Sequence, residues 1–523
     1  MGDDWRGWVL YQIYPRSYQD TTGDGVGDLN GITQRLEHVA SLGVDGVWLS
    51  PFFPSPMADF GYDVADYCGV DPLFGTLEDF DRLVERAHGL GLKVVIDQVW
   101  CHTSDRHAWF EASRQNRTGE HADWYVWADA KPEGSPPSNW QSVFGGPAWT
   151  WDARRGQYYM HNFLKEQPQL NLHHPPVQEA LLDAARFWLD RGVDGFRLDA
   201  LNFAVHDPAL TDNPPEPEGR GVWPRTRPFD FQQHVYNQSQ PQILEFLERV
   251  RRLTDRYGGR FTVAEVPGEE SGAERRAYTA PRRLSTAYGF DFLYAPELTA
   301  ARVHGAMAEW PEDAGWPAWA FSNHDAPRAV SRWAPEDERE AMQRMMTLLL
   351  MCLRGVVFLY QGEELGLPQG QVPFERLVDP EAIANWPKTL GRDGARTPMP
   401  WTAERPWAGF STVEPWLPVD ARHPGLSVAV QAADADSVLN LTRRLVAFRK
   451  AHEVLKTGAY RPVAAPEPLI AFERGGGAER LLCVFNPADA AVDWRLPGGW
   501  RAVEAVNGGE GFGPYAAIVA KAI

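Results

Sequence analysis

Length, composition and charge limit what this chain can be. Its 523 residues exceed one ordinary domain, so we expect about three domains or one large α/β barrel with attachments. The 70 Asp and Glu residues outnumber the 51 Lys and Arg residues, and the net charge of −19 disfavours nucleic acid and anionic membranes as partners, because both attract clustered cations. A hydrophobic share of 44% excludes global disorder. The 22 tryptophans indicate either a large core or a ligand with flat apolar faces and many hydroxyl groups.

Cysteine spacing and hydropathy indicate the cellular compartment in which the protein works. The four cysteines show no CxxC or Cys/His spacing, which excludes a disulfide scaffold and a structural zinc site. The first residues lack the apolar segment of a signal peptide, and no run of about 18 uncharged apolar residues could span a membrane. We therefore expect a cytoplasmic, reducing compartment. The cysteines are Cys68, Cys101, Cys352 and Cys483.

In chain order, the sequence repeats an amphipathic helix, a glycine break and a short apolar run. One such helix follows Thr76, a candidate N-cap, and repeats apolar residues at helical spacing from Phe80 to Ala87. Eight apolar runs alternating with helices predict an α/β fold, a closed (β/α)8 barrel with a parallel sheet. An open doubly wound sheet is the alternative, although no GxGxxG motif follows the first run. The predicted strands are residues 9–14, 44–50, 93–97, 192–199, 261–266, 290–294, 319–322 and 355–360.

Three segments depart from this repeat. Residues 103–172 are rich in aromatic residues, Gly and Pro, contain six tryptophans and predict an inserted loop-rich domain. Residues 203–240 form a long Pro-rich loop. From residue 457 onward, short apolar runs between Gly and Pro predict an antiparallel β module. We therefore predict a barrel from residues 1–102 and 173–456, an inserted domain at 103–172 and a C-terminal β-sandwich at 457–523.

Acidic residues close or follow four of the predicted strands. In a (β/α)8 barrel the carboxyl ends of the strands form the active site, so these side chains are the first candidates. One carboxylate after a strand is more often a helix cap or an ion-pair partner, but four at one barrel mouth indicate chemistry. Burying them together is unfavourable unless cations or shared protons offset the cost. They are Asp97, Asp199, Glu265 and Asp325.

Two of these carboxyl groups are predicted to differ in protonation. Arg197 leaves the same face of its strand as Asp199, and a neighbouring guanidinium lowers the pKa of a carboxyl group and keeps it ionised. Glu265 lies in an apolar segment, which favours the protonated form. Such a pair is typical of glycoside hydrolysis, where one carboxylate attacks and the other group protonates the leaving oxygen. His102 and His324 are candidates for hydrogen bonds to sugar hydroxyls, although each alone would be an ordinary loop histidine.

Segments around these residues resemble the signature regions of the α-amylase superfamily, glycoside hydrolase family 13. Four of them occur in the family's order: DQVWCH at 97–102, GFRLD at 195–199, VAE at 263–265 and FSNHD at 321–325. Three more resemble the α-glucosidase/oligo-1,6-glucosidase branch: GYD at 61–63, QPQLN at 167–171 and RDGARTP at 392–398. The resemblance spans nearly the whole chain and implies a TIM barrel with a loop-rich domain inserted after strand 3 and a C-terminal antiparallel β domain.

The resemblance implies a role for each residue that matches a family motif. Asp199 would be the nucleophile, Glu265 the general acid/base, and Asp325 the third carboxylate, which grips sugar hydroxyls. The pair Asp59 and Arg392 would close the pocket behind the terminal glucose and make the enzyme exo-acting. The other implied pocket residues are Arg197, which orients the nucleophile, His102 and His324, which bind the glucose, Tyr62, which stacks under it, and Phe144 and Phe163, which wall it.

Some positions depart from the family pattern or refine it. Cys101 stands where the family usually has Asn, and Gln169 stands where this branch usually has Asp. Ala200 follows the nucleophile; in this branch Val there accompanies α-1,6 preference, and Ala or Thr accompanies α-1,4 preference. The resemblance therefore implies maltose-like substrates. Arg396 is an alternative partner for Asp59, with a structural role as the first expectation.

Residues 20–28 have the spacing of a Ca²⁺-binding loop. Oxygen donors occupy relative positions 1, 3, 5, 7 and 9, with Gly25 at position 6, as at the start of an EF-hand loop. Position 12 is Gly31 rather than Glu, so the loop is not an EF-hand, and an Asp- and Gly-rich turn without an ion is the alternative. The resembled branch carries Ca²⁺, sometimes Mg²⁺, in this loop, which implies a structural ion and no organic cofactor. The donors are Asp20, Thr22, Asp24, the carbonyl group of Val26, and Asp28.

The expected function is that of an exo-acting retaining α-glucosidase, which releases α-glucose from the non-reducing end of short α-1,4-linked glucosides and also transfers glucose. Within the same class, the alternatives are an oligo-1,6-glucosidase and a sucrose- or trehalose-active hydrolase or isomerase. From another class, the alternative is a catalytically inactive barrel that serves as a binding subunit. The expected partner is a small oligosaccharide, and the expected state is a monomer or homodimer.

Overall fold

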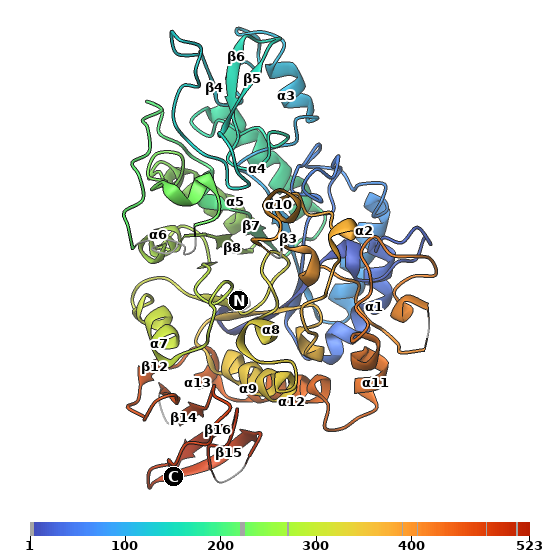
Figure 1. Ribbon diagram of the computed structural model, residues 1–523, viewed down its shortest axis with the longest axis vertical. Helices are drawn as coiled ribbons and strands as arrows, with labels where there is room; N and C mark the ends of the chain where they lie inside the picture. Colours follow the sequence, from blue (N-terminus) through green and yellow to red (C-terminus); the bar gives the residue numbers. More distant parts are fainter. Residues whose placement is uncertain are drawn as a thin grey trace.

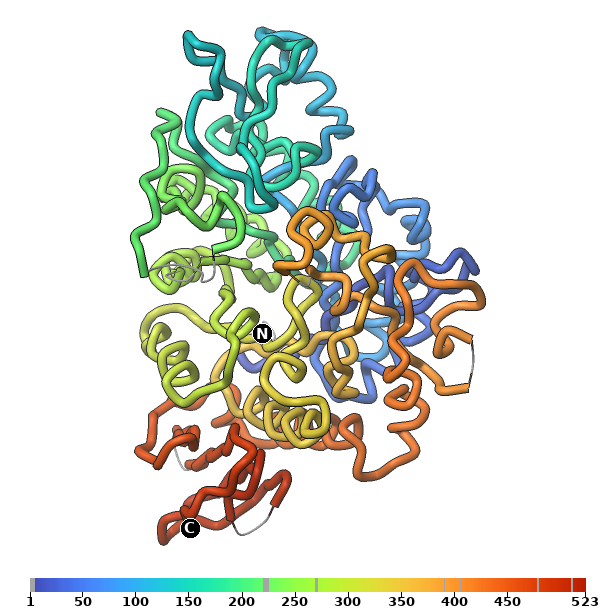
Figure 2. Tube along the Cα trace, viewed as in Figure 1, coloured from blue at the N-terminus to red at the C-terminus, as the bar shows by residue number. Residues whose placement is uncertain are grey.

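The computed structural model describes residues 5–219, 225–268, 271–389, 391–404, 406–476, 479–508 and 511–523. A central barrel lies between two smaller parts, with the inserted segment at one end and the C-terminal sheet at the other (Figure 1). The chain leaves the barrel after β3, builds the inserted part and returns to the barrel at α4, as the colour change along the trace shows (Figure 2).

Within the described residues, eight parallel strands form the barrel in the order β10-β11-β1-β2-β3-β7-β8-β9. A parallel bridge between Ala287 and Pro317 joins the two ends of this order and closes the barrel. Trp48, Phe261 and Phe358 pack inside it, whereas the outward faces of the strands pack against the helices. This confirms the predicted fold class. The strands are β1 (Val9–Ile13), β2 (Gly46–Leu49), β3 (Lys93–Gln98), β7 (Gly195–Leu198), β8 (Phe261–Glu265), β9 (Thr286–Tyr288), β10 (Ala318–Ala320) and β11 (Val356–Tyr360).

Side-chain caps fix where several barrel helices begin. Asp28 accepts a hydrogen bond from the amide of Gly31 at the start of α1, and Thr76 forms a reciprocal capping box with Asp79 at the start of α2. Ser437 caps α12 through the amide of Asn440. The helices are α1 (Leu29–Ser41), α2 (Leu77–Gly89), α4 (Pro175–Asp190), α5 (Ile243–Arg256), α6 (Gly272–Tyr278), α7 (Ala300–Ala308), α8 (Ala329–Trp333), α9 (Arg339–Cys352), α10 (Pro380–Asn385), α11 (Val428–Ala432), α12 (Val438–Ala451) and α13 (Glu453–Lys456). No helix in the described ranges is long and apolar enough to cross a membrane.

The sixth strand lies earlier than the sequence predicted. The prediction of a strand at 290–294 is wrong: the strand is β9, and residues 290–294 form a bend and a turn. Phe292 packs against Trp319 and Phe321 rather than extending the sheet. Because β9 is only three residues long, its apolar signal was weaker than that of the turn that follows it.

The inserted part has its own small core. In its described residues, a three-stranded antiparallel sheet has the order β4-β6-β5. Trp140 and Trp149 are buried and stack on one another with centroids 5.7 Å apart, so these two rings stabilise the insert itself. The elements are α3 (Ala108–Ser113), β4 (Trp127–Ala128), β5 (Trp149–Asp152) and β6 (Gln157–Met160).

The C-terminal part differs from the expected β-sandwich. Its described residues form one antiparallel sheet of five strands in the order β12-β13-β14-β16-β15. One face, which includes Phe472 and Cys483, packs on the barrel helices, and the other carries Leu482 and Ile518 under irregular chain that includes Phe512. Loops therefore cover the face that a second sheet would cover in a sandwich. The strands are β12 (Ala459–Pro462), β13 (Ile470–Gly476), β14 (Glu479–Phe485), β15 (Trp500–Val506) and β16 (Ala517–Ala522).

Candidate active site

Three neighbouring strands bring acidic residues together at the carboxyl end of the barrel. Asp97 lies in β3, directly beside Arg197 in the register of the β3–β7 pair. Asp199 follows β7, and Glu265 is the last residue of β8. All four side chains are buried, with the side chain of Arg197 fully inaccessible. The parallel sheet therefore creates the convergence that was predicted from strand ends alone.

One guanidinium group contacts all three carboxyl groups. Nη1 of Arg197 lies 2.7 Å from Oδ1 of Asp97 and 2.6 Å from Oδ1 of Asp199, while Nη2 lies 2.6 Å from Oε1 of Glu265. We call these four residues the Arg197 cluster. Three ionised carboxylates around one cation would leave a buried net negative charge, which is unfavourable in a medium of low dielectric constant. The Arg197 cluster is therefore suited to hold a proton that its carboxyl groups share.

Arg197 lowers the pKa of Asp199, as the sequence predicted, but burial and the other carboxyl groups outweigh it. Burial raises the pKa of Asp199 well above its usual value, and the neighbouring carboxylate of Glu265 adds to this, although Arg197 lowers it. Burial likewise raises the pKa of Asp97 to about 6 against the opposing effect of Arg197. The surroundings of Glu265 also differ from the expected apolar setting. Its oxygens contact Arg197, the hydroxyl of Tyr288 and the amide of Ala200.

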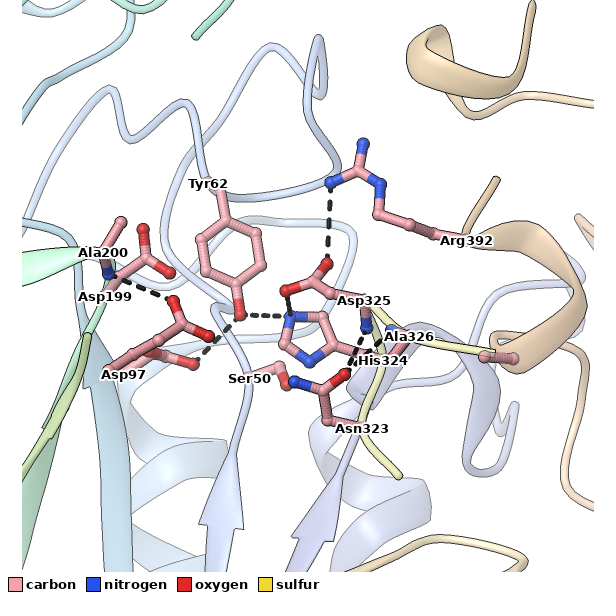
Figure 3. Close-up of polar contacts among 12 residues, drawn as sticks. Ser50, Tyr62, Asp97, Asp199, Ala200, Asn323, His324, Asp325, Ala326 and Arg392 are labelled. Carbon is pink, nitrogen blue, oxygen red and sulfur yellow. Dashed lines mark hydrogen bonds and ion pairs between the residues drawn. The ribbon is translucent and has the colours of Figure 1, made fainter. Parts of the chain in front are cut away.

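Asp325, which follows β10, lies in a different electrostatic environment. Its Oδ1 is 2.7 Å from Nη2 of Arg396. The same Oδ1 is 3.6 Å from Nη1 of Arg392, and Oδ2 is 3.1 Å from Nε2 of His324 (Figure 3). Burial alone would raise the pKa of Asp325, but His324, Arg396 and Arg392 outweigh burial and hold it below its usual value. Asp325 is therefore a fixed anion, suited to accept hydrogen bonds from sugar hydroxyls.

Tyr62 links Asp325 and its partners to the Arg197 cluster. Its ring stacks on His324 at a centroid distance of 5.3 Å, and its hydroxyl lies 2.6 Å from Nε2 of His324 and 3.2 Å from Oδ2 of Asp97 (Figure 3). Gln12 donates to Nδ1 of His324 at 2.7 Å, which leaves the proton on Nε2. Burial lowers the pKa of His324 to about 3, so the ring is neutral at pH 7.

Asp59 and Arg392 form the pair that the resemblance implied. Nη2 of Arg392 is 2.8 Å from Oδ1 of Asp59 and 2.7 Å from Oδ1 of Asp379, and its guanidinium lies 5.1 Å from the ring centroid of Phe144. Arg396 contacts the carbonyl of His324 and the carboxylate of Asp325, which it shares with Arg392.

Sequence reasoning missed two residues of the site, Asp379 and Tyr288. Asp379 caps α10 and also accepts hydrogen bonds from the backbone and side chain of Arg392. The dipeptide Asp379-Pro380 signals only a helix start. Tyr288 was missed because the predicted strand begins at residue 290, four residues after the observed start of β9.

His102 and Phe163 line the same region. Nε2 of His102 donates to the carbonyl of Tyr62 at 3.0 Å, and the ring of Phe163 lies 5.2 Å from His102 and 6.0 Å from Phe144. Burial lowers the pKa of His102 to about 4, so this ring is also neutral. The sulfur of Cys101 lies 3.0 Å from Nδ1 of His102, so the residue that departs from the family contacts a residue of the pocket.

Gln169, the other departure, ties the insert to the barrel. Its side-chain amide donates to the carbonyl of Phe203 at 2.7 Å and accepts from Asn162 at 3.0 Å. These hydrogen bonds give Gln169 a structural role between β6 and the segment that follows the nucleophile.

Ala200 has a left-handed backbone, with φ 39° and ψ 44°. A non-glycine residue in this region is strained, and such strain persists only where the surroundings impose it. The conformation directs the amide of Ala200 to Oε2 of Glu265 at 3.1 Å. Strained backbone therefore contacts the predicted acid/base residue.

The carboxylates of the predicted metal loop accept hydrogen bonds from the loop itself, from the start of α1 and from Ser411. Asp20 accepts hydrogen bonds from the amides of Thr22, Gly23 and Gly25 and from the hydroxyl of Ser411. Asp24 accepts from the amide of Val26, and Asp28 accepts from Thr21 and caps α1. In the described part of the chain, no three His, Cys, Asp or Glu side chains converge as metal ligands would. Any ion here would rely on carbonyl and hydroxyl oxygens as well.

The fold and site together define a glycoside hydrolase. Residues 12–458 match the family model of the alpha-amylase catalytic domain, so the chain belongs to the alpha-amylase family. A probable alpha-glucosidase from Rhizobium meliloti (strain 1021) is 52% identical over 503 residues, covering 95% of this chain and 91% of that protein. An oligo-1,6-glucosidase from Heyndrickxia coagulans is 34% identical over 536 residues, covering 95% and 94%. The crystal structure of an alpha-glucosyl transfer enzyme has a TM-score of 0.96 at 49% identity, covering 99% of both chains.

These relatives confirm the predicted branch: the chain is a glycoside hydrolase of the α-glucosidase/oligo-1,6-glucosidase type. The alternative of an inactive binding subunit is therefore set aside. The names of these relatives state different linkages and reactions, so they support glucosidase activity without a linkage preference.

Proposed function

We propose that this protein is an exo-acting, retaining α-glucosidase in which Asp199 is the nucleophile and Glu265 the general acid/base. The observation that carries the proposal is that one guanidinium, that of Arg197, contacts an oxygen of both residues at 2.6 Å. This shared contact holds the two carboxyl groups close together, as a covalent double displacement requires.

The reaction proceeds in two balanced steps. The carboxylate of Asp199 attacks the anomeric carbon, the glycosidic C–O bond breaks, and Glu265 gives its proton to the leaving oxygen. Glu265 then takes a proton from water, whose oxygen displaces Asp199 and releases α-glucose. Asp325, as a fixed anion, would grip the hydroxyls of the bound glucose. NMR detection of the first-formed anomer tests retention; release of β-glucose from an α-glucoside would contradict it.

Exo action is supported by the ion pairs of Arg392. This residue bridges Asp59 and Asp379 while its guanidinium lies over Phe144, so a buried charged wall stands at the glucose end of the site. Chain ends should enter, and internal linkages should not. Product analysis with maltose through maltopentaose tests this: each cleavage should release one glucose together with the oligosaccharide shortened by one unit. Early formation of two maltose molecules from maltotetraose, without glucose, would contradict it.

We further propose an α-1,4 preference, carried by Ala200 beside the acid/base residue. The expected ratio of kcat/KM favours maltose over isomaltose. Faster hydrolysis of isomaltose would favour the oligo-1,6-glucosidase alternative. Hydrolysis or isomerisation of sucrose or trehalose as the main activity would favour the sucrose- or trehalose-active alternatives.

Retaining chemistry also permits an alcohol to replace water in the second step, so transglucosylation is expected. The alpha-glucosyl transfer enzyme that resembles this chain supports this. Formation of trisaccharide at high maltose concentration tests it.

We also propose that residues 20–28 bind a structural Ca²⁺ or Mg²⁺, supported by the oxygen donors of Asp20, Thr22, Asp24, Val26 and Asp28. The carboxylates of this loop contact the loop itself, the start of α1 and Ser411, so the ion would raise stability and leave the chemistry unchanged. A melting temperature that rises with Ca²⁺ and falls with chelator would support this, whereas an unchanged value would favour the ion-free turn.

We propose a cytoplasmic location and a monomeric or homodimeric state. The described cysteines are all free thiols, as in a reducing compartment. Light scattering coupled to size exclusion measures the mass in solution, and a trimer or larger assembly would contradict the proposed state.

A further inference from the structure

Tyr288 lies next to the predicted acid/base residue for reasons of sheet register. It ends β9 and pairs directly with Glu265 at the end of β8. Its ring packs inside the barrel, 6.4 Å from Trp48 and 5.6 Å from Phe358 between centroids. Because packing on two sides fixes the ring, it also fixes where the hydroxyl lies.

The hydroxyl of Tyr288 joins Arg197 to Glu265. It donates to Oε1 of Glu265 at 3.0 Å and accepts from Nε and Nη2 of Arg197 at 3.2 and 3.0 Å. A phenol has one proton and two lone pairs, so these contacts use its full hydrogen-bonding capacity. Burial raises the pKa of Tyr288 well above its usual value, which keeps the proton on the hydroxyl and its role as donor intact.

The two oxygens of Glu265 therefore have unequal surroundings. Oε1 contacts a cation, Arg197, and the phenol of Tyr288, and both interactions favour an oxygen without a proton. Oε2 accepts one neutral backbone hydrogen bond, from Ala200, and keeps a lone pair for a proton. The contacts thus distinguish one oxygen of this carboxyl group from the other.

We infer that Tyr288 is a positioning residue, which holds Oε1 of Glu265 against Arg197 and thereby makes Oε2 the oxygen that exchanges the proton with the substrate. The inference rests on the proposed role of Glu265. In the first step the proton leaves Oε2 for the glycosidic oxygen as the C–O bond breaks and Asp199 bonds to the sugar. In the second step water returns a proton to Oε2 as its oxygen displaces Asp199.

The variant Tyr288→Phe keeps the ring and removes the hydroxyl. We expect kcat for maltose to fall about 10- to 100-fold, the size of effect of one lost hydrogen bond to a charged group, with little change in KM. Loss of a donor to the carboxylate favours its protonated form, so the alkaline limb of the kcat/KM–pH profile should move to higher pH. The groups that face this hydroxyl are Glu265 and Arg197, with Asp97 and Asp199 sharing the same guanidinium.

The dependence of activity on the leaving group separates an effect on proton transfer from a general structural effect of the substitution. p-Nitrophenyl α-glucoside has a leaving group that needs little protonation, so Tyr288→Phe should lose several-fold less activity on it than on maltose. The matched control is Tyr11→Phe, because Tyr11 is also buried and donates one hydrogen bond to a buried glutamate, Glu364, at 2.7 Å in the core. The control should lower the melting temperature without changing the pH profile or the ratio of the two substrates.

Equal losses on both substrates with an unmoved pH profile, or full activity of Tyr288→Phe, would overturn the inference. Glu265→Gln is measured in the same assays to separate this outcome from failure of the proposed function. A large, leaving-group-dependent loss in Glu265→Gln without one in Tyr288→Phe rejects only the role of Tyr288. Full activity of Glu265→Gln on maltose would reject the acid/base assignment itself.

Discussion

The Arg197 cluster and the surroundings of Asp325 lie side by side but balance charge in opposite ways. Among the described residues, the single guanidinium of Arg197 contacts three carboxyl groups, whereas the single carboxyl group of Asp325 contacts Arg396, Arg392 and His324. Burial consequently raises the pKa of Asp97 to about 6, while the pKa of Asp325 is held below its usual value although burial opposes this. A site can therefore keep an exchangeable proton and a permanent anion on the two sides of one tyrosine, Tyr62, by distributing its guanidinium groups unequally.

The largest expected effect is the loss of activity when the proposed nucleophile is removed from the Arg197 cluster. In Asp199→Ala we expect kcat to fall on the order of 10⁵-fold, because covalent catalysis is lost while the fold is kept. Steady-state kinetics on maltose and p-nitrophenyl α-glucoside measure the effect. Asp190→Ala, an exposed aspartate at the end of α4, is the control and should retain full activity. Substantial turnover by Asp199→Ala would assign the nucleophile elsewhere.

The variant Arg392→Ala tests the other region, the surroundings of Asp325. This change leaves Asp59 and Asp379 without their shared cation, and removing one member of a buried charged pair costs about 2–5 kcal/mol. We expect kcat/KM to fall about 30- to 1,000-fold, mainly through KM, because the groups affected lie at the end of the site that is proposed to bind glucose. Arg376→Ala, which removes an exposed ion pair with Glu414, provides the comparison and should behave as the wild type. A pure kcat effect of Arg392→Ala would show that Arg392 acts on the reaction step instead.

The smallest expected effect concerns the pH dependence of stability. The pKa of Asp97 is raised in the folded state to about 6, so between about pH 4 and 6 the folded protein binds more protons at this site than the unfolded chain. This group therefore lowers the free energy of unfolding as pH rises through that window, by up to about 3 kcal/mol. Urea unfolding from pH 4 to 7 should show a shallower decline in Asp97→Asn than in the wild type. Parallel curves would mean that another member of the Arg197 cluster carries the proton.

Sequence reasoning identified every residue of the Arg197 cluster, because each lies at a strand end and the family motifs surround it. The pair Asp59 and Arg392 also came from motifs, and the structure places these two 2.8 Å apart. Asp379 gave no such signal, since its local sequence indicates a helix start and its contact with Arg392 depends on how two loops meet. The raised pKa of Asp199 was not predicted, because the sequence shows one adjacent cation but conceals the burial of the side chain, which is the largest cause, and the carboxyl groups brought from other strands.

By itself, the sequence determined the barrel, the inserted and C-terminal parts and the acidic residues of the site, because periodicity, breaks and motifs are local properties. Only the tertiary structure decided that one guanidinium contacts three carboxyl groups while Asp325 contacts two guanidinium groups, those of Arg396 and Arg392. It also decided that Tyr288, in a strand too short to predict, contacts Glu265. Charge balance and hydrogen-bond partners depend on distances between segments far apart in the chain, and folding alone sets those distances.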